Sequence, residues 1–126
     1  MKEQDLQDAE YAFPYHYVSR FKDGFNQTFT DTWGIHYVST IEYLLQRLVE
    51  LQWSSLLDIG CGDGRMTREI KLRFPYRNVS GIDFSTRAIQ LAKAMNQDIP
   101  DISFDSRDIT IRQSIETYDI ALLMEV

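Results

Sequence analysis

The chain has 126 residues, of which 44% are hydrophobic and 25% are charged, as expected for one soluble globular domain. A net charge of -6 argues against a duplex nucleic-acid partner, which needs a basic face to neutralise phosphates. The densest basic stretch, residues 65–77, has the charge spacing of the outer face of a helix. A single cysteine, Cys61, excludes an internal disulfide and a metal site of the paired-cysteine type, so we expect no metal.

The first ten residues are acidic and polar, and they lack the apolar stretch of a signal peptide. No apolar run approaches the roughly 20 residues that a membrane-spanning helix needs. We therefore expect a cytoplasmic protein that does not enter a membrane.

An aromatic-rich stretch, residues 11–29, belongs to an N-terminal segment that we place at residues 1–32. Its aromatic side chains follow no single period for long, and Pro14 and Gly24 interrupt them. We expect irregular structure there with a short helix. A longer helix is predicted over residues 33–51, with Asp31 or Thr32 as its cap. Its apolar residues recur at three- and four-residue spacing and should face the core: Ile35, Val38, Ile41, Leu44, Leu45, Leu48 and Val49.

Strands and helices then alternate. The pattern predicts strands at residues 56–59, 79–83, 102–104 and 118–124, and helices at residues 66–74 and 86–95, the second capped by Ser85. A weak helical turn is expected at residues 109–116. The alternation indicates βαβ units, a parallel sheet and right-handed crossovers. The last strand is apolar nearly throughout, which is typical of a strand buried on both faces.

The strongest local signal is a glycine-rich loop that follows the first strand of this alternation and opens a helix. Residues 58–64 read Asp-Ile-Gly-Cys-Gly-Asp-Gly. Glycines allow a tight turn and let a ligand approach bare backbone, and the helix start adds a positive dipole end. A dinucleotide fingerprint is G-x-G-x-x-G, but Arg65 stands where its third glycine would be. The carboxylate of Asp58 suits a ligand with an ammonium group and would repel a pyrophosphate.

Residues 56–65, Leu-Leu-Asp-Ile-Gly-Cys-Gly-Asp-Gly-Arg, resemble the first motif of class I S-adenosylmethionine-dependent methyltransferases at every position that defines it. The resemblance covers about residues 56–126. It implies a doubly wound, Rossmann-like α/β domain and S-adenosylmethionine as the cofactor. It also implies that the loop residues bind this cofactor: Asp58, Gly60, Cys61, Gly62 and Gly64.

The end of the second strand carries Asp83, which lies 19 residues after Gly64. This is near the separation of about 20 that is typical of a carboxylate that binds ribose hydroxyls. The resemblance implies that role for Asp83, and it implies that Phe84 covers one face of the adenine. The alternatives are a helix cap for Asp83, although Ser85 can do the capping, and a core position for Phe84.

The third and fourth strands end in further candidates. The resemblance assigns Asp108 to the adenine amino group and places its neighbour, Ile109, on the ring. Asp105 competes with Asp108, and a helix cap is the other alternative for Asp108. The resemblance also places Met124 beside the methionine end of the cofactor, with a core position as an equally weighted alternative.

The family's sheet has seven strands, and only four can be placed here. We therefore expect residues 33–126 to form an incomplete methyltransferase domain that stops after its fourth strand. The free edge of that strand would favour aggregation. Residues 1–32 either form a lid over the acceptor, as segments before the first strand do in the family, or pack against the sheet.

Methyl transfer is an in-line displacement at a sulfonium carbon, so the protein mainly has to align the reactants and exclude water. An oxygen acceptor also needs a general base. His16 and His36 are candidates, although a lone histidine is more often structural, and no base is apparent beside the Cys61 thiol. No catalytic residue is assigned. We expect a small-molecule acceptor with oxygen as the favoured atom. The alternatives are a non-catalytic S-adenosylmethionine-binding module and a nicotinamide-dependent oxidoreductase, against which Arg65 counts.

Overall fold

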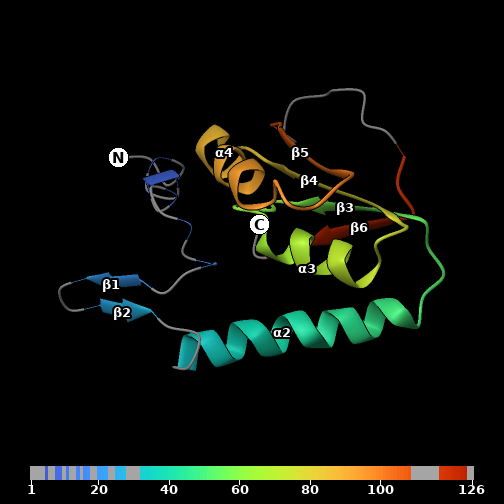
Figure 1. The fold of residues 1–126 in the computed structure, drawn as a ribbon, viewed down its shortest axis with the longest axis horizontal. Coiled ribbons are helices and arrows are strands. Elements are labelled where there is room, and N and C mark those ends of the chain that lie inside the picture. Colours follow the sequence, from blue (N-terminus) through green and yellow to red (C-terminus); the bar gives the residue numbers. More distant parts are fainter. Residues whose placement is uncertain are drawn as a thin grey trace.

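The computed structural model describes residues 5, 8–9, 11, 14, 16–17, 20–22, 25–27, 32–108 and 117–124. Two short strands come first, followed by a long helix and then by alternating strands and helices (Figure 1). The elements are β1 (Arg20–Lys22), β2 (Phe25–Gln27), α2 (Thr32–Val49), β3 (Ser55–Ile59), α3 (Arg65–Arg73), β4 (Asn78–Asp83), α4 (Thr86–Met95), β5 (Ile102–Ser106) and β6 (Ile120–Leu123). Every helix and strand predicted after residue 32 is present within two residues of its expected bounds, except the helical turn at residues 109–116, which lies outside the described residues.

Four parallel strands form one sheet in the order β5-β4-β3-β6. The chain steps outward from β3 to β4 to β5, and β6 then pairs on the other side of β3. In open α/β sheets, ligands bind at the carboxyl ends of the strands, where the strand order reverses. The predicted Rossmann-like arrangement is therefore confirmed for these four strands, and its switch point lies between β3 and β6.

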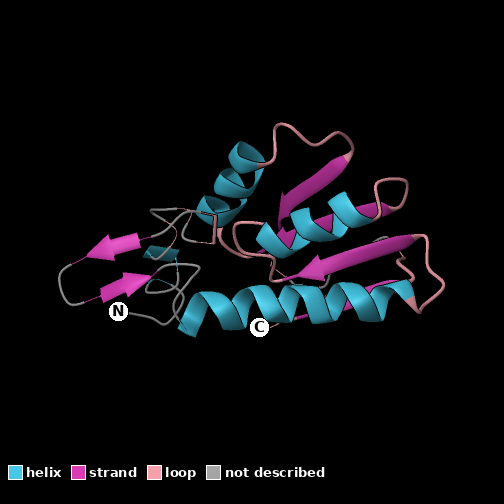
Figure 2. Cartoon of the chain, turned by 60° about the horizontal axis from the view of Figure 1, so that its bottom comes forward, coloured by secondary structure: helices cyan, strands magenta, loops and turns pink. Residues whose placement is uncertain are grey.

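The three helices α2, α3 and α4 pack on one face of this sheet (Figure 2). The register pairs Leu56 with Val79 and Val79 with Ile102, and paired residues point to the same face. Residues of α2 and α3 form a buried cluster with β3 and β4: Ile41, Leu45, Leu48, Trp53, Leu56, Met66, Ile70 and Val79. On the same face, α4 packs over β5 through a second cluster: Ile89, Ala92 and Phe104, with Ile102 and Cys61.

The apolar stripe of α2 is narrower than predicted. Ile35, Val38 and Val49 were expected to face the core, but they are 57%, 43% and 58% exposed. The first turns of α2 extend past the sheet toward β1 and β2, which accounts for the exposure of Ile35 and Val38 in the described part of the chain (Figure 1). Among the described residues, no helix combines the length and the apolar character needed to cross a membrane.

The prediction that the last strand is buried on both faces is wrong for the described structure. Half-buried and exposed residues alternate along β6, and Leu123 is 61% exposed. Ile120 and Leu122 pack against the core cluster of α2 and α3. Within the described residues β6 pairs only with β3 and has one covered face, so an apolar sequence on both faces leaves one of them in solvent.

The expectation of irregular structure with a short helix is also wrong for residues 20–22 and 25–27, which form strands. β1 and β2 pair as an antiparallel hairpin, with Arg20 opposite Gln27 and Lys22 opposite Phe25. Residues 23 and 24 lie outside the described residues, but their sequence, Asp-Gly, is among the strongest signals for a two-residue hairpin turn. The prediction for this segment was based on its irregular aromatic spacing and overlooked the Asp-Gly dipeptide.

Candidate functional site

The carboxyl ends of the four parallel strands meet at one edge of the sheet. The register pairs Ile59 with both Ile82 and Leu123, and it pairs Asp83 with Ser106. The predicted site residues lie at or just after these strand ends: Asp58, Gly60, Cys61, Gly62, Gly64, Asp83, Phe84, Asp108 and Met124. The structure thus brings together residues from four separate segments. Ile109, the remaining predicted site residue, lies outside the described residues.

The glycine loop is held against the end of β4 by its own backbone. The amides of Gly60 and Cys61 both donate to the carbonyl of Ile82, at 2.8 and 2.9 Å, and the amide of Gly64 donates to the carbonyl of Cys61 at 3.0 Å. All three loop glycines have positive φ angles, 74° at Gly60, 59° at Gly62 and 80° at Gly64, a region that other residues rarely adopt. The loop therefore has a fixed shape that depends on glycine.

The three glycines differ in what covers them. Gly60 is exposed, whereas Gly62 and Gly64 are buried. A Cβ atom at Gly62 would collide with the hydroxyl of Tyr11, and one at Gly64 would lie 2.7 Å from the ring of Phe104. Gly60 therefore offers bare backbone to a ligand, while the other two glycines allow close packing.

The carboxylate of Asp83 links the glycine loop to α4. Its Oδ2 accepts a hydrogen bond from the Gly62 amide at 2.9 Å, and its Oδ1 accepts one from the Ser85 amide at 2.8 Å. Ser85 caps α4 as predicted, because its hydroxyl accepts from the Ala88 amide at 3.1 Å. Each carboxylate oxygen has a further lone pair, so Asp83 can still accept hydrogen bonds from ligand hydroxyls.

Phe84 does not occupy a core position, because its side chain is 53% exposed at the end of β4. The end of β5 lies beside it, since the Ser106 hydroxyl donates to the Phe84 carbonyl at 3.3 Å and the Arg107 amide donates to the Asp83 carbonyl at 2.9 Å. An exposed aromatic ring next to a carboxylate is a suitable platform for a purine base.

The two acidic candidates after β5 have different surroundings. Asp105 is exposed and forms an ion pair with Arg107 at 2.8 Å, and this hydrogen bond holds the pKa of Asp105 below its usual range. Asp108 is half-buried and follows the residue whose amide is bonded to β4. Of the two carboxylate residues, Asp108 is thus the less exposed one.

Asp58 lies in the interior rather than on the surface of the loop. It is 2% exposed, and its Oδ2 accepts a hydrogen bond from the Thr67 hydroxyl at 2.8 Å, which ties β3 to α3. Burial raises the pKa of Asp58 to about 7, and the charge of Asp83 adds to this effect while the Thr67 hydrogen bond opposes it. Its predicted pairing with a ligand ammonium group therefore competes with a structural role.

Cys61 and Met124 are both packed into the protein. Burial raises the pKa of the Cys61 thiol, helped by nearby carboxylates, so the thiol stays protonated at neutral pH. Its sulfur lies so close to β4 that a Cβ atom at Gly81 would be 2.9 Å away. Met124 is half-buried and packs against the core cluster of α2 and α3. The Cys61 thiol thus packs against β4, while the Cys61 amide holds the loop to the carbonyl of Ile82.

Sequence reasoning missed the importance of Asp63, which stands between Gly62 and Gly64. Its side chain is 1% exposed, and its Oδ1 lies 2.8 Å from Nδ1 of His16. The His16 amide donates to its Oδ2 at 3.4 Å, and the hydroxyl of Tyr17 donates to its carbonyl at 2.6 Å. An acidic residue inside a glycine loop was the available signal. Of the two histidines, only His16 lies at the loop, while His36 is exposed on α2.

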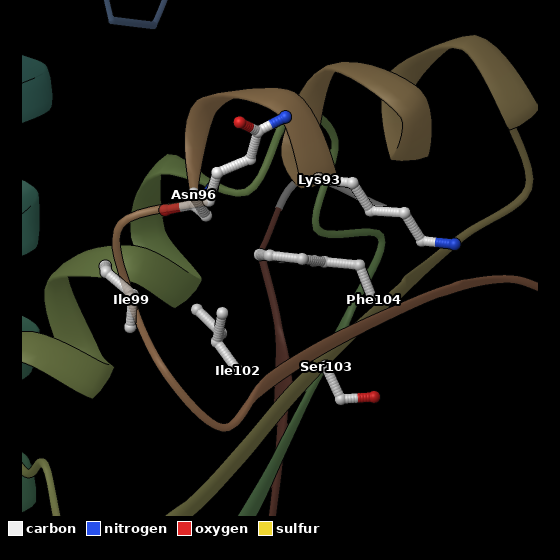
Figure 3. A pocket seen from close by; sticks show the side chains of 7 residues that line it. Lys93, Asn96, Ile99, Ile102, Ser103 and Phe104 are labelled. Carbon is white, nitrogen blue, oxygen red and sulfur yellow. The ribbon is translucent and has the colours of Figure 1, made fainter.

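A separate pocket of about 370 Å³ lies between the end of α4 and the start of β5 (Figure 3). Its lining residues are Lys93, Asn96, Gln97, Ile99, Ile102, Ser103 and Phe104. The side-chain amide of Asn96 is already engaged, since it donates to the Tyr17 hydroxyl and to the Ala92 carbonyl. The pocket extends along β5 away from Ser106, so it is distinct from the site at the carboxyl ends of the strands.

Residues 56–126, more than half of the chain, match the family model of the methyltransferase domain. The chain belongs to this family. Trans-aconitate 2-methyltransferase from Deinococcus radiodurans is 41% identical over 66 residues, which cover 52% of this chain and 25% of that protein. Malonyl-[acyl-carrier protein] O-methyltransferase from Bacillus cereus is 27% identical over 84 residues, which cover 67% of this chain and 31% of that protein. The chain thus spans between a quarter and a third of the length of these two relatives.

Solved structures share the same fold. Coclaurine N-methyltransferase, bound to N-methylheliamine and S-adenosylhomocysteine (SAH), superposes with a TM-score of 0.64 and 18% identity over 94% of this chain and 39% of that chain. A TehB-like S-adenosylmethionine-dependent methyltransferase from Corynebacterium glutamicum gives a TM-score of 0.51 and 28% identity over 64% of this chain and 42% of that chain. The resemblance to S-adenosylmethionine-dependent methyltransferases is therefore confirmed.

Proposed function

We propose that this chain binds S-adenosylmethionine and forms the cofactor half of an enzyme that methylates a small-molecule acceptor in the cytoplasm. One observation carries the proposal: exposed backbone at Gly60, the carboxylate of Asp83 and the exposed ring of Phe84 lie at one edge of the sheet. A nucleoside ligand can use all three features. Its ribose hydroxyls donate hydrogen bonds to a carboxylate, its base stacks on an aromatic ring, and backbone without a side chain lets it approach closely.

The hydrogen bonds of the loop argue against a dinucleotide. Pyrophosphate sites use unpaired backbone amides at a glycine loop and helix start. Here the amides of Gly60, Cys61, Gly62 and Gly64 all donate to groups of the protein itself. To use the loop amides, a phosphate would have to displace these bonds, whereas a ribose could reach the oxygens of Asp83 without breaking them.

The cofactor supplies the methyl group on an activated sulfonium centre. In the proposed site, Asp83 accepts from the ribose, Phe84 covers the adenine and Asp108 accepts from its amino group. The fixed loop brings bare backbone against the ligand at Gly60. These residues hold the donor in one orientation, which is the main contribution that a methyltransferase makes to an in-line displacement.

A small acceptor with a reactive oxygen is the substrate class that we propose. Support comes from relatives named for malonyl-[acyl-carrier protein] O-methylation and for trans-aconitate methylation. The net charge of -6 also suits a nucleic-acid partner poorly.

Calorimetric titration with SAH tests the cofactor proposal, with NADH as the competing ligand. We expect micromolar binding of SAH and none of NADH. Asp83→Ala should weaken SAH binding about tenfold or more, because a charge-assisted hydrogen bond is lost. Glu50→Ala is the matched control, since Glu50 is exposed and pairs only with Arg47 among the interactions seen. A folded chain that does not bind SAH, or that binds NADH more tightly than SAH, would overturn the proposal.

The enzymatic part has its own test. Methyl-labelled S-adenosylmethionine is incubated with the protein and a panel of small carboxylic acids, alcohols and amines. Label transfer to an oxygen acceptor supports the proposed activity. Binding of SAH without transfer to any acceptor would instead identify a non-catalytic S-adenosylmethionine-binding module.

A further inference from the structure

Four described residues of the N-terminal segment, Asp8, Tyr11, His16 and Tyr17, contact the candidate cofactor site, and we refer to them as the strap. Asp8 is bound at the start of α4. The Ser85 hydroxyl donates to the carboxylate of Asp8, and the Arg87 guanidinium lies 3.9 Å from the same carboxylate. Ser85 is also the residue whose amide binds Asp83, so this end of the strap meets the proposed ribose-binding group.

The other end of the strap is anchored at the start of α3. His16 is bound to the buried carboxylate of Asp63 through its ring and its amide, and the guanidinium of Arg65 donates to the His16 carbonyl at 2.6 Å. The ring of His16 also stacks on Tyr37 of α2, with the ring centroids 5.0 Å apart.

Tyr17 strengthens this second anchor. Its hydroxyl donates to the Asp63 carbonyl at 2.6 Å and accepts from the Asn96 side chain at 2.9 Å. Burial raises the pKa of Tyr17, so the hydroxyl keeps its proton and remains a donor. The anchor therefore ties the segment to α2, α3 and the end of α4 together.

Tyr11 lies in the chain between the two anchors, and its side chain reaches the middle of the glycine loop. It is 8% exposed, and its hydroxyl occupies the space where a side chain at Gly62 would begin. The amide of Gly62 is bonded to Asp83, while the neighbouring Gly60 is exposed. The Tyr11 hydroxyl thus lies against Gly62, whereas the backbone of Gly60 is exposed.

We propose that Tyr11 is a cofactor-contacting residue that forms the wall of the site next to Gly62, and that His16 is a positioning residue that holds Tyr11 there through Asp63. This inference rests on the proposed binding of S-adenosylmethionine. It assigns to the N-terminal segment a part in binding the cofactor itself, which differs from a lid over the acceptor. Since the anchors bind Asp63 of the glycine loop and Ser85 beside Asp83, the test of the strap needs no acceptor.

The test measures SAH affinity by calorimetry in matched pairs of variants. Tyr11→Leu should weaken binding about tenfold, because an aromatic wall is lost, and Tyr11→Phe should stay within about threefold. Tyr76→Leu is the control for a lost tyrosine, since Tyr76 is fully exposed. His16→Gln should weaken binding about threefold to tenfold, whereas His36→Gln, on the exposed histidine, should leave it unchanged.

A second measurement keeps the proposal testable if a variant fails to fold. Hydrogen exchange of the unmodified chain is followed with and without saturating SAH, and we expect the amides of Tyr11, His16 and Tyr17 to gain protection. Unchanged SAH affinity in folded Tyr11→Leu, or unchanged exchange in the strap on binding, would overturn the inference while leaving the cofactor proposal intact. Failure of the folded, unmodified chain to bind SAH would overturn both the strap inference and the cofactor proposal. The two kinds of failure are distinguishable, because only the second removes SAH binding by the unmodified chain.

Discussion

Asp83 and Gly62 are joined by a hydrogen bond of 2.9 Å from the backbone amide of Gly62 to the carboxylate of Asp83. The group proposed to bind ribose therefore also fixes the middle of the glycine loop. Because Ser85 donates to the other carboxylate oxygen, the side chain is oriented before a ligand arrives. Such preorganisation lowers the ordering cost of binding.

Removing this carboxylate should affect stability as well as binding. Asp83→Asn keeps only one acceptor oxygen for two backbone donors, so we expect a loss of about 1 kcal/mol in the free energy of unfolding without any ligand. Asp83→Ala removes both acceptors and should cost about 1–3 kcal/mol. Urea unfolding followed by circular dichroism measures both values. Equal stability of all three chains would show that water replaces these hydrogen bonds without loss.

The strands and their parallel arrangement could be predicted from sequence because short segments rich in apolar residues end in turn residues and alternate with helices. Leu56 and Val79, two apolar residues of the predicted strands, are indeed fully buried at the centre of the sheet. The apolar run of β6 was equally clear, but its exposure depends on what covers the strand, and no local pattern reveals that. Sequence pattern thus predicts which elements form more reliably than it predicts their burial.

In the candidate site, too, features with a local sequence signal could be predicted, whereas long-range contacts could not. The glycine loop and Asp83 could be found from spacing, because backbone conformation and strand ends leave local signals. The contacts of Asp63 with His16 and Tyr17 could not, since 46 and 47 positions separate the partners and both come from a segment without clear periodicity. Asp58 was assigned by motif, and only its burial beside Thr67 reveals a competing structural role.

Recognition of the adenine amino group should depend on Asp108 and not on Asp105. Asp108→Asn should weaken SAH binding about fivefold, because a charge-assisted hydrogen bond becomes a neutral one. Asp105→Asn should stay within about twofold, since Asp105 is exposed and paired with Arg107. The inosine analogue of SAH carries a carbonyl in place of the amino group, and Asp108→Asn should reduce discrimination against it. Loss of discrimination in Asp105→Asn instead would reassign the contact.

Phe84 should contribute to binding and little to folding. Its ring is 53% exposed, so Phe84→Ala removes little buried area and should change the free energy of unfolding by less than about 1 kcal/mol. If adenine stacks on the ring, SAH affinity should fall about fivefold to tenfold. Calorimetry measures the SAH affinity and thermal unfolding measures the change in stability. Tyr76→Ala is the control for an exposed aromatic residue. A large loss of stability would indicate that Phe84 packs inside the protein.

The raised pKa of Asp58 predicts how stability depends on pH. The folded chain holds the proton of this carboxyl up to about pH 7, whereas the unfolded chain releases it near the ordinary value of 3.8. Ionisation of Asp58 therefore costs nothing below about pH 4, and its cost grows as the pH rises from about 4 to 7 and is then constant. At about 1.4 kcal/mol per pKa unit, the full cost is at most about 4 kcal/mol.

Asp58→Asn isolates this effect because the amide oxygen can still accept from Thr67. Relative to the unmodified chain, the variant should gain about 2–4 kcal/mol in unfolding free energy between pH 4 and pH 8. Urea unfolding at several pH values measures this difference. SAH binding by the same variant separates the two roles of Asp58: unchanged affinity supports the structural one, and a loss of about tenfold supports pairing with the ligand's ammonium group. A difference in stability that does not vary with pH would mean that Asp58 ionises normally.

Two glycines of the loop should respond differently to the same substitution. Gly64→Ala places a Cβ atom 2.7 Å from the ring of Phe104 at a φ of 80°, so backbone strain and a clash in the core act together. We expect a loss of about 2–4 kcal/mol in unfolding free energy, or failure to fold. Gly60→Ala has a similar φ of 74° but an exposed position, and it should cost only about 1 kcal/mol. If the cofactor lies against Gly60, that variant should nevertheless bind SAH at least about tenfold more weakly. Tight binding by folded Gly60→Ala would mean that the ligand approaches the sheet edge from elsewhere.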